Sequence, residues 1–143
     1  MPGYEWDESE WPLVRVKVHP TFTPVDQEGM FVRFRQMLER KTRCVLVHDS
    51  RQAPPASAVA RQRVVQAMGE LEPLATRYMA GVAVVLSSTV QRGILTAILW
   101  VRPAPYPLQV VATVEAGEAW ARERLNESPR SGRGQGAGPP SMR

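Results

Sequence analysis

One run of residues, Cys44-Val45-Leu46-Val47-His48-Asp49, constrains the fold of this chain more than any other stretch. Its consecutive apolar residues are typical of a strand that is buried on both faces, as in a parallel sheet. The run ends in polar residues, and a helical pattern begins after Pro54 and Pro55. Because open α/β sheets place their sites where parallel strands end, the run predicts a site at its carboxyl end.

A strand with a different pattern precedes this run. From Leu13 to Val18 apolar and polar residues alternate, which predicts one face packed on the core and one face in water. We expect this strand to pair with a short strand at residues 4–6, in a hairpin whose polar turn is formed by residues 7–10.

After the hairpin, helix and strand patterns alternate along the chain. Helices are expected to begin after Thr23, after Ser57, after residues 87–89 and at Glu115, with strands at residues 44–47, 82–86 and 108–114. This order predicts an α/β domain at residues 1–125, with a mainly parallel sheet of four to five strands and helices packed on it.

Side-chain patterns add detail to three of these helices. Pro73 should kink or end the second helix, because proline lacks a backbone N–H. The third helix is apolar around most of its circumference, so it should be largely buried. The fourth should turn Ala116, Ala119 and Trp120 inward, with the tryptophan anchoring it on the sheet.

Composition bounds the remaining possibilities. Residues 126–143 are rich in Gly, Pro, Ser and Arg, which predicts a disordered tail. A single cysteine excludes an intrachain disulfide. The acidic N-terminus lacks an apolar signal segment, and the longest apolar stretch is too short to span a bilayer, so we expect a cytoplasmic protein. The net charge of +4 is read as a solvated basic surface, and no nucleic acid partner is expected.

Three stretches resemble the STAS domain of bacterial anti-sigma-factor antagonists, and in particular the divergent SpoIIAA-like group, which shares a fold theme with CRAL-TRIO lipid-binding domains. They are residues 44–49, 81–87 and 115–121. The resemblance implies a non-enzymatic regulatory domain that docks a partner protein, such as a kinase or another regulator. In phospho-switched members a serine in an Asp-Ser-x-Gly pattern accepts phosphate. That pattern is absent here, and Ser57 or Ser50 would take a similar place.

The predicted docking site lies at the sheet edge. Asp49 ends the buried strand, and we expect it to pair with Arg61 or Arg92, near the starts of the second and third helices. Together with Arg51, these arginines would form an edge that accepts an acidic protein segment or a phosphate.

Other chemistry finds little support in the sequence. The Gly-x-Ser-x-Gly elbow of serine hydrolases is absent, and His19, His48 and Asp49 lack the spacing of paired metal ligands, so neither an enzyme nor a cofactor or metal is expected. The alternative to docking is a carrier or sensor of a small ligand, such as a lipid or nucleotide. A closed apolar cavity above about 300 Å³ would favour the carrier, and a filled core with a flat, exposed apolar or charged patch would favour docking.

Overall fold

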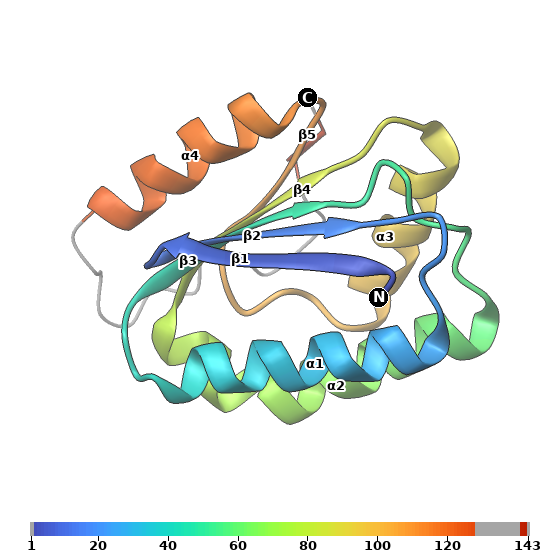
Figure 1. The fold of residues 1–143 in the computed structure, drawn as a ribbon, viewed down its shortest axis with the longest axis horizontal. Helices are drawn as coiled ribbons and strands as arrows, with labels where there is room; N and C mark the ends of the chain where they lie inside the picture. The colour runs from blue at the N-terminus through green and yellow to red at the C-terminus, as the bar shows by residue number, and fades with distance from the viewer. Residues whose placement is uncertain (1, 128–140, 143) are drawn as a thin grey trace.

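The computed structural model describes residues 2–127 and 141–142, which form one mixed sheet with helices on both of its faces (Figure 1). The strands are β1 (Tyr4–Glu10), β2 (Leu13–Val18), β3 (Cys44–Asp49), β4 (Met79–Val85), β5 (Leu108–Val111) and the two-residue β6 (Ser141–Met142). They lie in the sheet in chain order, and only β1 runs antiparallel to its neighbour. The predicted α/β class and mainly parallel sheet are confirmed, with β6 as an additional short edge strand.

The helices are α1 (Pro24–Glu39), α2 (Ala58–Tyr78), α3 (Thr89–Val101) and α4 (Val114–Asn126). Helices α1, α2 and α3 pack on one face of the sheet, whereas α4 packs on the other (Figure 1). Each begins at a hydroxyl N-cap that accepts a hydrogen bond from a first-turn N–H: Thr23, Ser57, Ser88 and Thr113. Within the predicted tail, residues 141–142 form β6, and residues 128–140 and 143 lie outside the described residues.

The central strand β3 is buried on both faces, as predicted. Cys44 and Leu46 contribute to the core beneath α1, α2 and α3, whereas Val45 and Val47 contribute to the core beneath α4. These alternating directions follow from the period of two residues along a strand. Parallel pairing with β2 and β4 places Leu46 between Val14 and Val82.

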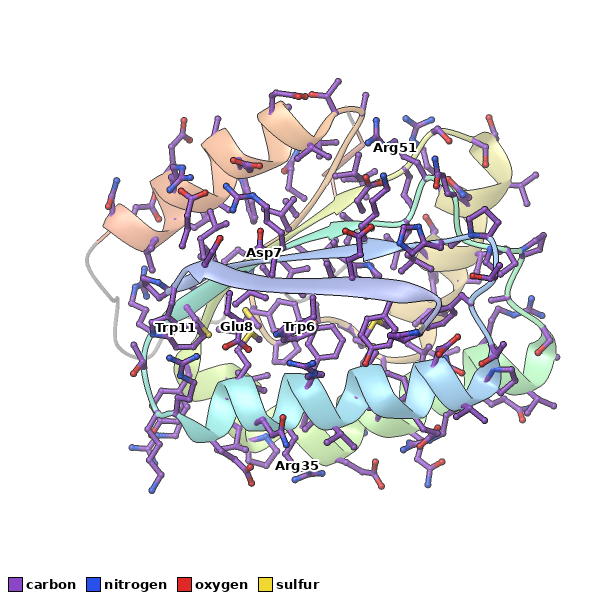
Figure 2. All side chains as sticks on the ribbon, in the orientation of Figure 1. Trp6, Asp7, Glu8, Trp11, Arg35 and Arg51 are labelled. Carbon is purple, nitrogen blue, oxygen red and sulfur yellow. The ribbon has the colours of Figure 1, made fainter. Side chains whose placement is uncertain are left out.

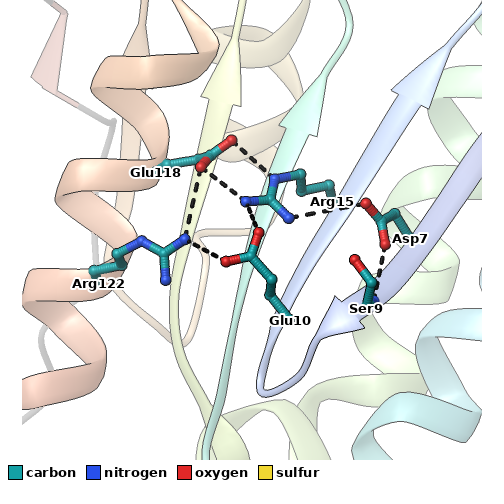
Figure 3. A network of polar contacts seen from close by, with 6 residues as sticks. All are labelled: Asp7, Ser9, Glu10, Arg15, Glu118 and Arg122. Carbon is teal, nitrogen blue, oxygen red and sulfur yellow. Dashed lines mark hydrogen bonds and ion pairs between the residues drawn. The ribbon is translucent and has the colours of Figure 1, made fainter.

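The second face of β2 is covered by α4 at Leu13 and Arg15 and exposed at Lys17. Leu13 is only 1% exposed beneath α4. Arg15 donates from Nε and Nη2 to the carboxylate of Glu118 on α4, at 2.8 and 2.9 Å. Glu10 and Arg122 extend this ion-pair network, with Arg122 Nη2 2.9 Å from Glu10 Oε1 (Figure 3). The predicted water-facing side is therefore confirmed at Lys17 and wrong at Arg15, which α4 partly covers.

The hairpin is longer than predicted. Residues 7–10 continue β1, and the turn lies at Trp11 and Pro12. Asp7 points to the α4 side of the strand, whereas Trp6 and Glu8 point toward α1 (Figure 2). The acidic residues remain in the strand because they find partners there: Asp7 and Glu10 pair with Arg15, and Glu8 with Arg40.

Pro73 does not end α2, which continues to Tyr78. Leu71, Leu74 and Ala75 pack against the sheet around it, so tertiary contacts hold the last turns in place. Helix α3 also departs from the prediction, because only Ile98 and Leu99 are buried. Its outer face is exposed, and its large apolar members are Val90, Trp100 and Val101.

The inward face of α4 consists of Gly117 and Ala121, not of Ala116 and Ala119, which are exposed. A Cβ at Gly117 would lie 3.3 Å from Val111 and Val47 side-chain atoms. The missing side chain therefore lets the helix axis approach the sheet closely. The predicted contact of Trp120 is present: its ring is half-buried and packs over Gly81 of β4.

No helix in the described part of the chain is long and apolar enough to cross a membrane.

Candidate functional site

A cavity of about 520 Å³ lies between the sheet and helices α1, α2 and α3. Val18, Leu46 and Val84 line it from the sheet, and Phe34 and Leu95 line it from the helices. Within the described residues, its lining includes no Asp, Glu, Lys or Arg. The space is partly open to solvent, so it is not the closed cavity of the sequence-based criterion, although its volume exceeds the roughly 300 Å³ named there and lies in the range of small-molecule sites.

Small side chains on α2 help to leave this space open. Ala60, Ala67 and Ala75 face the cavity from three successive parts of the helix. Leu71 and Met68, also on α2, border the space and are only partly buried. The apolar stripes of the helices were visible in the sequence as core positions. Whether these apolar residues fill a core or line a cavity depends on the distance between the helices and the sheet, and no sequence pattern predicts that distance.

One end of the cavity is polar. Ser50 Oγ lies 2.9 Å from His48 Nδ1, at the carboxyl end of β3. Gln91, in the first turn of α3, donates its side-chain amide to the carbonyls of Ser50 and Arg51, at 2.9 and 3.1 Å. Its oxygen accepts a hydrogen bond from the N–H of Ser87. These contacts tie the loop after β3 to the start of α3.

His48 is held in its neutral form by this setting. Burial lowers the pKa of His48 to about 4, against an ordinary value of 6.5, although the charge of Asp49 acts in the opposite direction. Its Nε2 is buried and has no hydrogen-bond partner among the described residues. An unpaired buried polar atom costs free energy, so this position is a candidate contact for a ligand.

Asp49 lies on the opposite face of β3 and is only 6% exposed. Arg51 donates to it from Nε at 2.9 Å, from Nη2 at 2.8 Å and from its backbone N–H at 3.1 Å. Burial raises the pKa of Asp49, but the hydrogen bonds and the charge of Arg51 outweigh it and hold that pKa below its usual value.

The predicted pairing of Asp49 with Arg61 or Arg92 is therefore wrong. Side chains alternate along a strand, so Asp49 points to the α4 face, away from the face on which α2 and α3 pack. Arg61 instead donates from Nη1 to the Ala56 carbonyl at 2.9 Å. The structure brings Asp49 and Arg51 together, and it leaves Arg61 and Arg92 near the starts of α2 and α3.

The two candidate phosphoacceptors have structural hydrogen bonds. Ser57 is the exposed N-cap of α2, where its hydroxyl accepts from the N–H of Ala60. Ser50 is partly buried and contacts His48. Phosphorylation of either remains a prediction from the family resemblance.

Cys44 does not have the properties of a nucleophile. It is buried in β3, and burial raises the pKa of its thiol to about 12. In the part of the chain that the structure describes, no group of three His, Cys, Asp or Glu side chains is placed to hold a metal ion.

Comparison with known proteins identifies the fold. No family model and no curated protein matches the chain. Among solved structures, it is similar to an uncharacterised protein of the DUF3478 family with a SpoIIAA-like fold from Shewanella loihica PV-4. The match has a TM-score of 0.58 and 17% sequence identity, and it covers 85% of this chain and 95% of the other. The chain therefore has a SpoIIAA-like fold, as the sequence resemblance predicted.

Proposed function

We propose that this protein is a non-enzymatic carrier or sensor that binds a small apolar molecule in the cavity between the sheet and α1, α2 and α3. The observation that supports this proposal is the cavity itself, whose volume of about 520 Å³ lies within the range of small-molecule sites. Its lining is mostly apolar, with a few polar groups gathered at one end, which is the usual composition of such sites.

Binding is testable with a neutral fluorescent probe. N-phenyl-1-naphthylamine is weakly fluorescent in water and bright in apolar surroundings, so we expect saturable uptake at about one probe per chain. Leu95→Trp, which places a larger side chain in the cavity, should weaken uptake at least about tenfold through lost space and contacts. Leu125→Trp makes the same exchange beneath α4, outside the cavity, and should bind the probe normally.

Two results would contradict the proposal: absence of saturable uptake by the unaltered protein, or equal uptake by a folded Leu95→Trp variant. Circular dichroism of both variants establishes that the fold is retained.

A second candidate is a regulatory domain that docks an acidic protein segment at the starts of α2 and α3. It is supported by Arg61 and Arg92, neither of which forms an ion pair with any of the described residues. Positive charge at a helix N-terminus adds to the attraction that the helix already exerts on anions.

For this candidate, Arg92→Glu should weaken binding of a fluorescein-labelled acidic decapeptide about tenfold or more, measured by anisotropy at low salt. Arg33→Glu makes the same charge change on the exposed face of α1 and serves as the control. Equal losses in the two variants would show that only net charge matters, and the edge would then have no special part in docking.

A further inference from the structure

The side chains that line the cavity indicate which charge a ligand can have. Among the described residues, the lining contains no Asp, Glu, Lys or Arg, so an ionised group inside would have no side chain of opposite charge as a partner. Burying an unpaired charge is among the most costly events in a protein interior. The two titratable side chains in the lining do not supply such a partner, because burial lowers the pKa of His48 to about 4 and raises that of Tyr106 to about 12.

The lining also has a direction. Its polar side chains, Tyr106 apart, lie at the carboxyl end of β3 and at the first turns of the helices or just before them: Thr23, Gln27, His48, Ser50, Ser57 and Gln91. The opposite end is lined by Leu38 at the end of α1, by Ala75 near the end of α2 and by Met79 at the start of β4. A molecule with one polar end and one apolar end would therefore fit in one orientation.

Most of the polar groups at that end are already engaged. Gln91 uses both its amide hydrogens and its oxygen in contacts with the protein. Ser57 caps α2, Thr23 caps α1, and Gln27 donates to the Ala60 carbonyl. Of the buried side-chain atoms that lack a partner among the described residues, only His48 Nε2 belongs to a residue that lines the cavity, and because protein atoms cover this nitrogen, a head group reaches it only when neighbouring side chains shift. A neutral imidazole nitrogen exchanges one hydrogen bond with a neutral head group and needs no compensating charge.

Resting on the proposed function, we infer that the ligand is an uncharged amphiphile. Its single hydrogen-bonding head, such as a hydroxyl or carbonyl, lies against His48, and its apolar body extends toward Leu38, Ala75 and Met79. Long-chain carboxylates and quaternary ammonium compounds should bind more weakly, because a charge placed against His48 would have no charged side chain of the described lining as a partner.

Three twelve-carbon compounds test the charge requirement: 1-dodecanol, dodecanoate and dodecyltrimethylammonium. Each competes with bound N-phenyl-1-naphthylamine at neutral pH, below its micelle concentration. We expect dodecanol to displace the probe at a concentration at least about tenfold lower than either ion, because only the alcohol enters without burying a charge. Equal displacement by dodecanol and dodecanoate would overturn this inference and leave the proposed function standing. Absence of probe uptake would instead defeat the proposed function.

The position of the head group is tested at His48. His48→Phe keeps a planar ring and removes both nitrogens, so it should weaken dodecanol binding about fivefold, the value of one net hydrogen bond. His19→Phe alters a histidine outside the cavity lining and is the matched control. Dodecanol binding that is unchanged in a folded His48→Phe variant would show that the head group lies elsewhere.

Discussion

Lowering the pH from 7 to 4.5 should reduce the free energy of unfolding by about 2.5 kcal/mol through His48 alone. In the unfolded chain this imidazole takes up a proton near its ordinary pKa of 6.5, whereas in the folded protein burial lowers that pKa to about 4. Between these values the unfolded state binds more protons than the folded state, so stability falls as the pH falls. The loss should begin near pH 6.5 and level off below pH 4.

Urea denaturation at a series of pH values measures this effect. His48→Gln removes the titrating group and keeps a polar side chain, so its stability should vary little between pH 7 and about 4.5. His19→Gln alters a partly exposed histidine that pairs with Glu5, and it should retain the steep dependence of the parent. Carboxyl groups with lowered pKa values, such as those of Asp49 and Glu118, act mainly below this window, because they release their protons at lower pH. Parallel curves for the parent and His48→Gln would show that His48 titrates normally in the folded state.

Gly117→Leu should reduce the free energy of unfolding by about 3 kcal/mol or more, a large part of the roughly 5–15 kcal/mol that a domain has. A Cβ at this position already reaches Val111 and Val47 at 3.3 Å and Ala83 at 3.4 Å. The rest of a leucine side chain would have no space between α4 and the sheet. The helix would have to move away and lose the burial of Ala121 and Leu13.

Gly117→Ala is the matched control for this change. Its methyl group would lie 3.3 Å from two valine side chains, closer than most Cβ contacts, so these must shift slightly. Alanine favours helix over glycine by up to about 1 kcal/mol, which offsets this cost, so the net change should be small. Chemical denaturation, followed by circular dichroism, compares the two variants with the parent. A Gly117→Leu variant as stable as the alanine variant would show that α4 is loosely attached to the sheet.

The sequence predicted the elements of this fold better than the faces that they present. Strand β3 could be predicted because an unbroken apolar run bounded by polar residues is typical of a buried strand. Thr23 and Ser57 predicted the starts of two helices, and the structure confirms both. The burial of helix α3 was predicted wrongly because a helix that is apolar around most of its circumference does not show which of its faces meets solvent. Trp100 and Val101 are exposed although their neighbours Ile98 and Leu99 are buried.

The candidate site was harder to predict for two physical reasons. Asp49 found its partner two residues along the chain, and the backbone geometry that allows Arg51 to reach it is set by the loop after β3 rather than by any periodic pattern. The cavity arises from the distances between helices and sheet, which depend on many contacts at once. His48 was noted in the sequence only as an unlikely metal ligand. Its position in an apolar strand was the one available sign that it would be buried.

The chain-order arrangement of β1 to β5 bears on how the protein folds during its synthesis. Each of these strands pairs with the strand made just before it, so a nascent chain can add one helix and one strand at a time to a sheet that already exists. The hairpin of β1 and β2 provides the first edge, and no long segment has to wait for a distant partner. Helix α3, which lines one side of the cavity, is synthesised after α1 and α2. The apolar faces of α1 and α2 are therefore exposed on that side until residues 89–101 have left the ribosome. During that interval the apolar lining of the unfinished cavity would be accessible to chaperones and to any ligand that is already present.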